Sequence, residues 1–427
     1  MCRSVFRRLP RVLSMTFSIC LMCAILAYRN AAIADSRPIT MNGRPFFMIG
    51  LYEYPAAPAT PVGGYPTTDF MRHLPELSKA GFNTILIKIR NTDPTSMDSA
   101  WQRYGIATMA DIGADGSDAL PYNIGSSASL KEGGVLDLKI RSLAKHPSLL
   151  GYYTVDEPYW GCRTEDAQTS QLRLDLTRGK EWLHDPERDP SHPIFYNEAC
   201  YLGVGVSDAK YKIWSSIGDV FSEDIYPIFY GTPPAYPNVD LSVVGKATKQ
   251  RQRTLLDPSA PVFMVLQGCS GEDWSIGHPY HTTARAPNFI ENRFMAYDCI
   301  INGARGILWW GTNYLDLSKP GDAETWREIK TIAGQLHQMP FLADASPKQN
   351  FTLGNGPLEA LLKSSGQAQY LIVADKSKES LTNVRISVPG WKYYRVLFEH
   401  RTLPQHEGSI TDSFQPWDVH IYTNQRP

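Results

Sequence analysis

Short apolar runs alternate with longer amphipathic segments over residues 46–338. Eight of the runs are rich in β-branched and aromatic residues, which predicts buried strands at residues 46–52, 83–89, 106–111, 149–155, 193–198, 217–227, 261–267 and 305–311. Apolar residues at helical spacing predict helices between them, at residues 67–80, 101–104, 136–144, 169–184, 241–256, 289–302 and 323–338. This alternation predicts an α/β fold of the (β/α)8 TIM-barrel type. An open doubly wound sheet is the alternative, but no glycine-rich phosphate-binding loop follows the first strand.

The pattern changes near Pro340. Short alternating runs follow at residues 360–363, 370–373, 384–388, 394–398 and 419–422, separated by turn signals such as Pro389-Gly390. They predict a small all-β sandwich domain at the C-terminus. A chain of 427 residues is too long for one ordinary domain. We therefore expect a barrel catalytic domain at residues 35–341 and a β-sandwich domain at residues 342–427.

The first 34 residues have the pattern of a secretory signal peptide. Arg7 and Arg8 belong to a positive region, residues 12–28 are apolar, and Ala32-Ile33-Ala34 resembles a cleavage site. A twin-arginine export route and an uncleaved membrane anchor are the alternatives. No later run is long and apolar enough to span a bilayer. We expect a secreted or periplasmic protein with no membrane partner after signal cleavage.

The amino-acid composition limits the classes of partner that we expect for the protein. The formal net charge is −1 and no long basic run follows the N-terminus, which argues against nucleic acid as the main partner. The 10 Trp and 22 Tyr suit stacking against flat rings of a ligand, although a large aromatic core needs them equally. The sequence does not indicate an oligomeric state.

Four cysteines follow the signal peptide: Cys162, Cys200, Cys269 and Cys299. Cys162 and Cys200 come after consecutive predicted strands, so we expect their loops to be neighbours and a disulfide between them. Cys299 lies in a helical segment, where a buried thiol is expected. No Cys/His spacing indicates a metal site, and we expect neither a metal nor a cofactor.

The fourth predicted strand ends abruptly in Asp156-Glu157-Pro158. Two carboxylates at this point are compatible with a simple turn and helix cap. In a TIM barrel, however, residues at the C-terminal ends of the strands converge on one mouth. The candidates at those ends are Tyr52, Glu53, Lys88, Arg90, Asp111, Asp156, Glu157, Asn197, Glu198, Asp224, Tyr226, Gln267, Trp309 and Trp310.

Acids, amides and aromatic rings around one rim suit a carbohydrate. Cleavage of a glycosidic bond needs one carboxylic acid to protonate the leaving oxygen and a second carboxylate to attack or to activate water. Strand alternation places Glu157 on the same face as Tyr153, and Asp224 on the same face as Tyr226. Glu223 falls on the opposite face, toward the helices.

These motifs resemble secreted glycoside hydrolases of the large (β/α)8 clan in which the acid/base Glu follows strand four. The runs that carry the resemblance are residues 42–47, 149–158, 224–227, 295–297, 303–310, 410–412 and 419–422. The resemblance implies that Glu157 is the general acid/base. The clan usually has Asn before this Glu, where it contacts a sugar hydroxyl, and here the residue is Asp156. The clan's nucleophile is a Glu at the end of strand seven, and here the residue is Gln267.

The second carboxylate therefore has two candidates, Asp224 and the loop residue Glu272. A separation of about 5 Å between the two carboxyl groups would indicate retention of stereochemistry, and about 6.5–9.5 Å inversion. We expect a glycosidase in which Gln267, Asn197, Tyr226 and Trp309 hold the sugar. The alternative is a non-catalytic barrel that binds carbohydrate without hydrolysing it.

Overall fold

The computed structural model describes residues 36–52, 54–55, 67–113, 124–158, 167–199, 208–228, 240–270, 285–344, 351–354 and 356–425. The expected signal peptide, Glu53, Glu272, and the cysteine pair Cys162 and Cys200 lie outside these residues. In the part of the chain described, no helix has the length and apolar character needed to cross a membrane.

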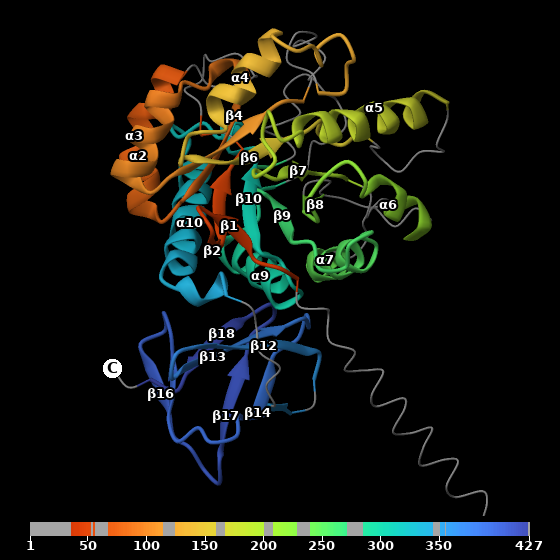
Figure 1. Cartoon of the computed structure of the whole chain (residues 1–427). Helices are drawn as coiled ribbons and strands as arrows, with labels where there is room; N and C mark the ends of the chain where they lie inside the picture. Colours follow the sequence, from red (N-terminus) through yellow and green to blue (C-terminus); the bar gives the residue numbers. More distant parts are fainter. Residues whose placement is uncertain are drawn as a thin grey trace, which may run out of the picture.

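Eight parallel strands form a closed barrel, as predicted (Figure 1). They are β3 (Met48–Leu51), β4 (Thr84–Lys88), β5 (Ala107–Asp111), β6 (Leu149–Tyr153), β7 (Ile194–Tyr196), β8 (Val220–Ile225), β9 (Val262–Gln267) and β10 (Gly306–Trp310). Pairing of β10 with β3, with Gly306 opposite Met48, closes the ring and excludes the open doubly wound sheet.

Helices surround this barrel in Figure 1. They are α2 (Thr67–Ala80), α3 (Pro94–Tyr104), α4 (Val135–Leu143), α5 (Ala167–Leu183), α6 (Asp208–Trp214), α7 (Val243–Arg253), α9 (Phe289–Ile301) and α10 (Pro320–His337). The sequence pattern did not predict α6, and it predicted only residues 101–104 at the C-terminal end of α3. Asp93 begins α3 as its N-cap by accepting from the Ser96 backbone N–H, and Pro94 is the first residue of the helix.

The strands separate two apolar layers. Side chains inside the barrel, such as Phe195, Phe263 and Leu308, pack against one another. Their neighbours along the strands, such as Met264 and Trp309, face the helices. This period of two decides which strand-end residues reach the mouth.

A hairpin packs against the inner layer. It consists of β1 (Ile39–Met41) and β2 (Arg44–Phe46), joined by Asn42 and Gly43, which both have positive φ (51° and 74°). Asn-Gly is the preferred pair for such a two-residue turn. Ile39 and Met41 join the apolar cluster inside the barrel.

Two antiparallel sheets form the C-terminal part of the chain, as expected for a sandwich. One has the order β11 (Thr352–Leu353), β14 (Leu381–Ser387), β17 (Ser409–Phe414); the other has the order β12 (Leu358–Ser365), β13 (Ala368–Asp375), β18 (Val419–Thr423), β15 (Tyr394–Val396), β16 (Arg401–Leu403). Apolar residues from both sheets, including Ile386, Phe414 and Tyr422, share one cluster.

The second sheet packs on α9 and on the short helix η4 (Pro340–Leu342). Arg293 of α9 donates to the carbonyl of Val419 at 2.5 Å, and Phe294 packs edge-on against Trp417. Phe341 stacks on Tyr370 with ring centroids 3.8 Å apart. Aromatic contacts and charged hydrogen bonds therefore join the two domains.

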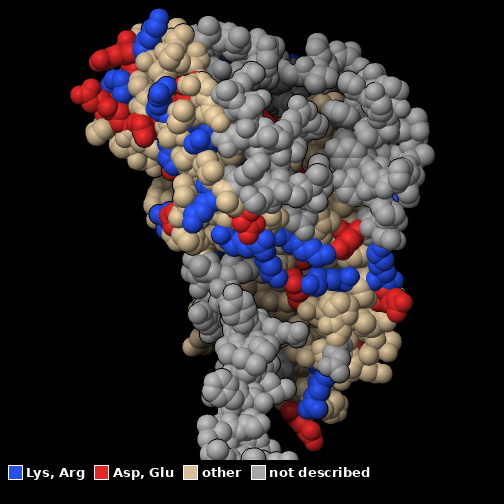
Figure 2. Space-filling model, turned by 90° about the vertical axis from the view of Figure 1, so that its right-hand side faces the viewer, with Lys and Arg blue, Asp and Glu red and all other residues tan. Residues whose placement is uncertain are grey.

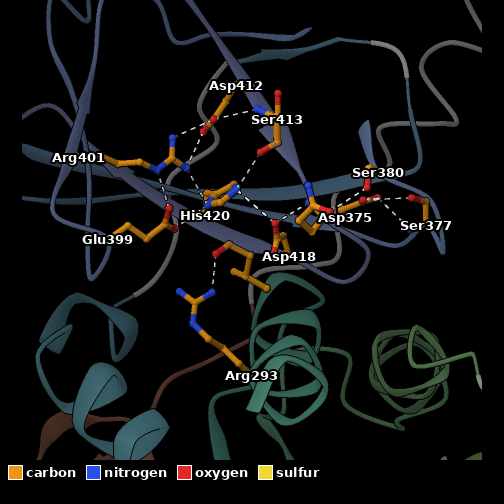
Figure 3. Close-up of polar contacts among 12 residues, drawn as sticks. Arg293, Asp375, Ser377, Ser380, Glu399, Arg401, Asp412, Ser413, Asp418 and His420 are labelled. Atoms are coloured by element: carbon orange, nitrogen blue, oxygen red, sulfur yellow. Dashed lines mark hydrogen bonds and ion pairs between the residues drawn. The ribbon is translucent and has the colours of Figure 1, made fainter. Parts of the chain in front are cut away.

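Buried charges near this junction compensate one another (Figure 3). Arg401 makes a bidentate ion pair with Asp412 at 2.8 and 3.0 Å and also contacts Glu399. His420 lies 2.6 Å from Glu399, and Tyr422 donates to Asp412 at 2.7 Å. The network holds β18 in place, and the Val419 carbonyl of this strand accepts the hydrogen bond from Arg293.

Figure 2 shows the side of the molecule where α7 lies, with Lys and Arg gathered in a band and acidic side chains between them. On α7, Lys246 pairs with Asp240 at 2.6 Å. Lys249 reaches Glu359 of β12 at 3.0 Å and so joins the barrel to the second sheet. The exposed pair of Lys246 and Asp240 contributes little stability by itself.

Candidate active site

Strand β6 leads directly into Asp156 and Glu157. Glu157 has φ of 43°, in the left-handed region that side chains with a Cβ rarely adopt. Such strain persists where the surrounding structure enforces it, and it is concentrated at functional sites. The backbone of Glu157 is the first indication that this turn does more than cap a helix.

Asp224 faces the same mouth from β8. Its side chain shares the inward face with Ser222, and the residue is 6% exposed. The Glu157 and Asp224 side chains lie close enough to interact, and each is among the causes of the other's pKa shift. The structure thus brings together the two predicted catalytic carboxyl groups.

Both carboxyl groups have raised pKa values. Burial is the largest cause for Glu157, and the negative charges of Asp224 and Asp156 raise its pKa further. Burial also raises the pKa of Asp224, while the interaction with Glu157 lowers it. Burial and mutual repulsion therefore oppose the presence of two negative charges in this pair.

A chain of hydrogen bonds fixes Asp156 beside this pair. The Tyr153 hydroxyl donates to Asp156 Oδ1 at 2.5 Å and also bonds the Tyr52 hydroxyl. From the other side, Asn197 Nδ2 donates to the same Asp156 oxygen at 3.0 Å. Ser222 donates to Asn197 Oδ1 at 2.6 Å, which sets the orientation of the amide.

This chain joins side chains from β3, β6 and β8 and from the ends of β6 and β7. Tyr52, Asp156 and Asn197 were predicted at the mouth, whereas Tyr153 and Ser222 were not among the candidates. Strand alternation was the signal that would have found them, because both share an inward face with a predicted catalytic residue.

An ion pair lies next to Asp156. Lys88 at the end of β4 contacts Asp111 at the end of β5, with Nζ and Oδ2 2.7 Å apart. The Gly113 backbone N–H donates to Asp111 at 2.8 Å. A Cβ at Gly113 would lie 2.8 Å from the Val155 backbone, so only glycine lets the loop after β5 approach the acidic turn this closely.

Aromatic rings form one wall of the mouth. Tyr226 and Trp310 stack with centroids 5.0 Å apart and planes 13° apart, and both are partly exposed. Tyr314 meets Trp310 at a 62° interplanar angle. A partly exposed stacked pair offers the flat apolar surface that a sugar ring packs against.

The prediction for Trp309 was wrong. Trp309 is fully buried, packs edge-on against Phe82 on the helix side of β10, and lies 3.4 Å from Asn292 through its indole nitrogen. Adjacent residues on a strand point to opposite faces, so only one of Trp309 and Trp310 can reach the mouth.

Gln267 also differs from its expected role. The residue is fully buried; its Nε2 donates to the Cys269 carbonyl at 2.9 Å and its Oε1 accepts from the Ile228 backbone N–H at 3.2 Å. Both ends of the amide hold loop backbone, so Gln267 shapes the mouth instead of holding a sugar.

Glu198 interacts electrostatically with Glu157 but does not face the mouth. Glu198 faces the helices, where it accepts from Tyr196 at 2.6 Å. No group of three or more His, Cys, Asp or Glu side chains in the described ranges is arranged to hold a metal ion.

No model of a protein family matches the chain, and no curated protein is similar to it in sequence. Solved structures do match. A GH42 beta-galactosidase from G. stearothermophilus, in its E323A catalytic mutant, has a TM-score of 0.60 at 9% identity, covering 92% of this chain and 100% of that one. A beta-galactosidase from Rahnella sp. R3 has a TM-score of 0.57 at 8% identity, covering 91% and 99%.

A third match is an alpha-amylase from Geobacillus thermoleovorans, complexed with acarbose, with a TM-score of 0.52 at 10% identity, covering 88% of this chain and 97% of that one. Sequence identities this low show only that the folds are similar. The chain therefore has the (β/α)8 barrel fold, with a C-terminal β domain, that these glycoside hydrolases share.

Proposed function

We propose that the protein is a glycoside hydrolase that cleaves O-glycosidic bonds of an oligo- or polysaccharide. The observation that carries the proposal is the close pair of carboxyl groups, Glu157 and Asp224, at the barrel mouth. Two neighbouring carboxyl groups with raised pKa values can provide the acid and the base or nucleophile that the reaction needs.

Glu157 is assigned as the general acid. Its high pKa keeps it protonated at neutral pH, so it holds the proton that the leaving oxygen requires. After the bond breaks, the same group accepts a proton from the attacking water.

Asp224 is assigned as the nucleophile. An inverting enzyme keeps its carboxyl groups about 6.5–9.5 Å apart to leave room for water, whereas a retaining enzyme holds them about 5 Å apart. Glu157 and Asp224 lie close enough to shift each other's pKa, which fits the closer arrangement. We therefore expect retention, with the two side chains separating as the sugar enters.

The wall formed by Tyr226 and Trp310 supports a carbohydrate ligand. The matched structures point in the same direction, because their titles name beta-galactosidases and an alpha-amylase complexed with acarbose. The fold hosts many chemistries, so the acid pair and not the barrel is the argument for hydrolysis.

We also propose export. The positive, apolar and small-residue segments of residues 1–34 support cleavage before Asp35 and a secreted or periplasmic location. N-terminal sequencing of the mature protein tests this. A first residue at Asp35 is expected, and an intact Met1 on exported protein would contradict it.

The test of hydrolysis is a screen of aryl glycosides and polysaccharides with wild type, Glu157→Gln and Asp224→Asn. Glu407→Gln is the control, because this side chain is 90% exposed and lies in the β domain. Turnover by wild type and the control, lost in both site variants, is expected. Equal turnover in Glu157→Gln would overturn the proposal. Proton NMR of the first-formed sugar anomer then decides between retention and inversion.

A non-catalytic carbohydrate-binding barrel is the second candidate. Gln267 favours it, because an amide stands where the resemblance leads one to expect a nucleophile and is already bonded to backbone. Binding of a glycan by wild type without turnover of any substrate in the screen would favour this function over hydrolysis.

A further inference from the structure

Lys88 and Asp111 occupy paired positions at the ends of neighbouring strands, β4 and β5. Strand alternation puts both side chains on the inner face, because Leu86 and Met109, two residues earlier, pack inside the barrel. Lys88 Nζ and Asp111 Oδ2 are 2.7 Å apart, and the two side chains are only 21% and 9% exposed. The mouth therefore contains a largely buried ion pair that the proposed reaction has not yet used.

The second oxygen of Asp111 binds backbone. Oδ1 accepts the Gly113 N–H at 2.8 Å. The intervening residue, Ile112, donates its backbone N–H to the Tyr153 carbonyl at 2.8 Å. Asp111 thus fixes the first residues after β5, and these residues in turn bond the end of β6.

Gly113 lies against the acidic turn, residues 154–157. A Cβ at Gly113 would come within 2.8 Å of the Thr154 carbonyl oxygen and of the Val155 backbone N and Cα atoms. Val155 is two residues before Glu157, whose φ of 43° is strained. Strained backbone persists only where the surrounding structure enforces it. The loop held by Asp111 contributes to that enforcement, since Val155 cannot relax toward the loop without displacing Gly113.

The charge of Lys88 also reaches the acidic turn. Burial raises the pKa of Asp156, and the positive charge of Lys88 is among the causes that lower it. The other titratable groups that interact with Asp156 are Asp111, Glu157, Asp224, Tyr52 and Tyr153. The same ammonium group therefore pairs with Asp111 and acts on Asp156.

We propose that Lys88 is a positioning residue of the hydrolase site, which through its ion pair with Asp111 holds the loop at Gly113 against the acidic turn and keeps Glu157 in place for proton transfer. This rests on the proposed hydrolase function and adds a residue on which that function depends. Lys88 acts through Asp111 and not by binding the sugar. Misplacement of a reacting group lowers turnover much more than substrate binding, so the loss of Lys88 should appear in kcat.

The first test is Lys88→Met, with thermal unfolding to verify that it folds. We expect kcat to fall roughly 10- to 100-fold, as a small displacement of the acid implies, with KM changed by less than roughly 2-fold. The pKa of Asp156, followed by NMR of labelled carboxyl carbons, should rise because a nearby positive charge is lost. Lys88→Arg keeps the charge and a donor for Asp111, so it should recover most of the lost kcat.

Lys180→Met is the matched control. Lys180 Nζ lies 2.6 Å from Asp219 Oδ1, and the two side chains are 23% and 31% exposed, but Asp219 precedes β8 and so lies at the end of the barrel opposite the mouth. Breaking this pair should lower the melting temperature and leave kcat and the pKa of Asp156 unchanged. A fall in kcat equal to that of Lys88→Met would overturn the positioning role.

Gly113→Ala tests the path between the ion pair and the turn. It leaves Lys88 and Asp111 in place, but its methyl group must displace the backbone at Val155. We expect kcat to fall as in Lys88→Met, again with little change in KM. A wild-type kcat in Gly113→Ala would overturn the path through this loop.

A measurement without substrate separates this inference from the proposed function. Amide hydrogen exchange at Gly113 and in the acidic turn should be roughly 10-fold faster in Lys88→Met than in wild type and unchanged in Lys180→Met. Faster exchange in a protein that hydrolyses no glycoside would support the positioning role and overturn the function. Hydrolysis in which Lys88→Met raises KM at an unchanged kcat would overturn the inference, because Lys88 would then bind the sugar, and would leave the function standing.

Discussion

The carboxyl groups of Glu157 and Asp224 lie together at the mouth of the barrel, where the negative charge of Asp224 helps to raise the pKa of Glu157. Activity requires protonated Glu157 and ionised Asp224, so kcat/KM should follow a bell-shaped pH profile. Burial raises both pKa values, so the acid limb should lie above about pH 4, the usual value for a carboxyl group. The alkaline limb should lie higher still. An acid limb at or below the usual carboxyl value would contradict the assignment.

Removing the negative charge of Asp224 should lower the pKa of Glu157, because that charge is among the causes that raise it. In Asp224→Asn we expect Glu157 to titrate at lower pH than in wild type. Titration of isotopically labelled carboxyl carbons by NMR measures both values. Glu407→Gln is the comparison, since this side chain is 90% exposed and lies in the β domain.

The acid pair should reduce stability at neutral pH. A carboxyl group whose pKa is raised by folding binds protons more tightly in the folded state, so stability falls as pH rises from about 4 through the folded pKa. Glu157→Gln should therefore be more stable than wild type near pH 7, and the difference should shrink near pH 4. Urea unfolding at both pH values measures this, and a difference independent of pH would contradict it.

The backbone strain at Glu157 gives a separate prediction. Glycine adopts a φ of 43° without steric cost, so Glu157→Gly should relieve about 1 kcal/mol of strain while abolishing hydrolysis. Glu157→Ala removes the same carboxyl group and keeps a Cβ. A Gly variant no more stable than the Ala variant would show that this conformation carries no strain.

The neighbouring tryptophans should respond in opposite ways. Trp310→Ala should raise KM roughly 10-fold, because the stacked surface beside Tyr226 is lost. Trp309→Ala should instead lower the unfolding free energy by about 3–5 kcal/mol, because the fully buried ring leaves a cavity. Kinetics and thermal unfolding on both variants separate the two effects.

Gln267→Glu should not restore a nucleophile. An ionised carboxylate there cannot donate to the Cys269 carbonyl, and leaving that buried contact unmade costs about 1–3 kcal/mol. We expect a lower melting temperature without a gain in activity. Higher activity at an unchanged melting temperature would show that the position is accessible to substrate.

The strands were predictable from sequence because their side chains are buried on one or both faces of the barrel wall. This burial produces the apolar runs and the period-two alternation. The same alternation placed Glu157 and Asp224 inward and Glu223 outward. Applied to β10, the same alternation would have shown that Trp309 and Trp310 point to opposite faces of the strand. The bonds of Gln267 were not predictable, since they join it to loop backbone whose path depends on the folded barrel. Local sequence likewise holds no signal for the positive φ of Glu157.

The contact between Tyr52 and Tyr153 joins residues 101 positions apart. It forms only when β3 has taken its place in the ring beside β4 and β10. A half-barrel of β3–β6 would contain both tyrosines as well as Asp156 and Glu157, but β3 and β6 are three strands apart and meet only through the curvature of the ring. Enzymatic activity should therefore return during refolding only when the whole ring has closed. Its recovery should come later than the recovery of secondary structure.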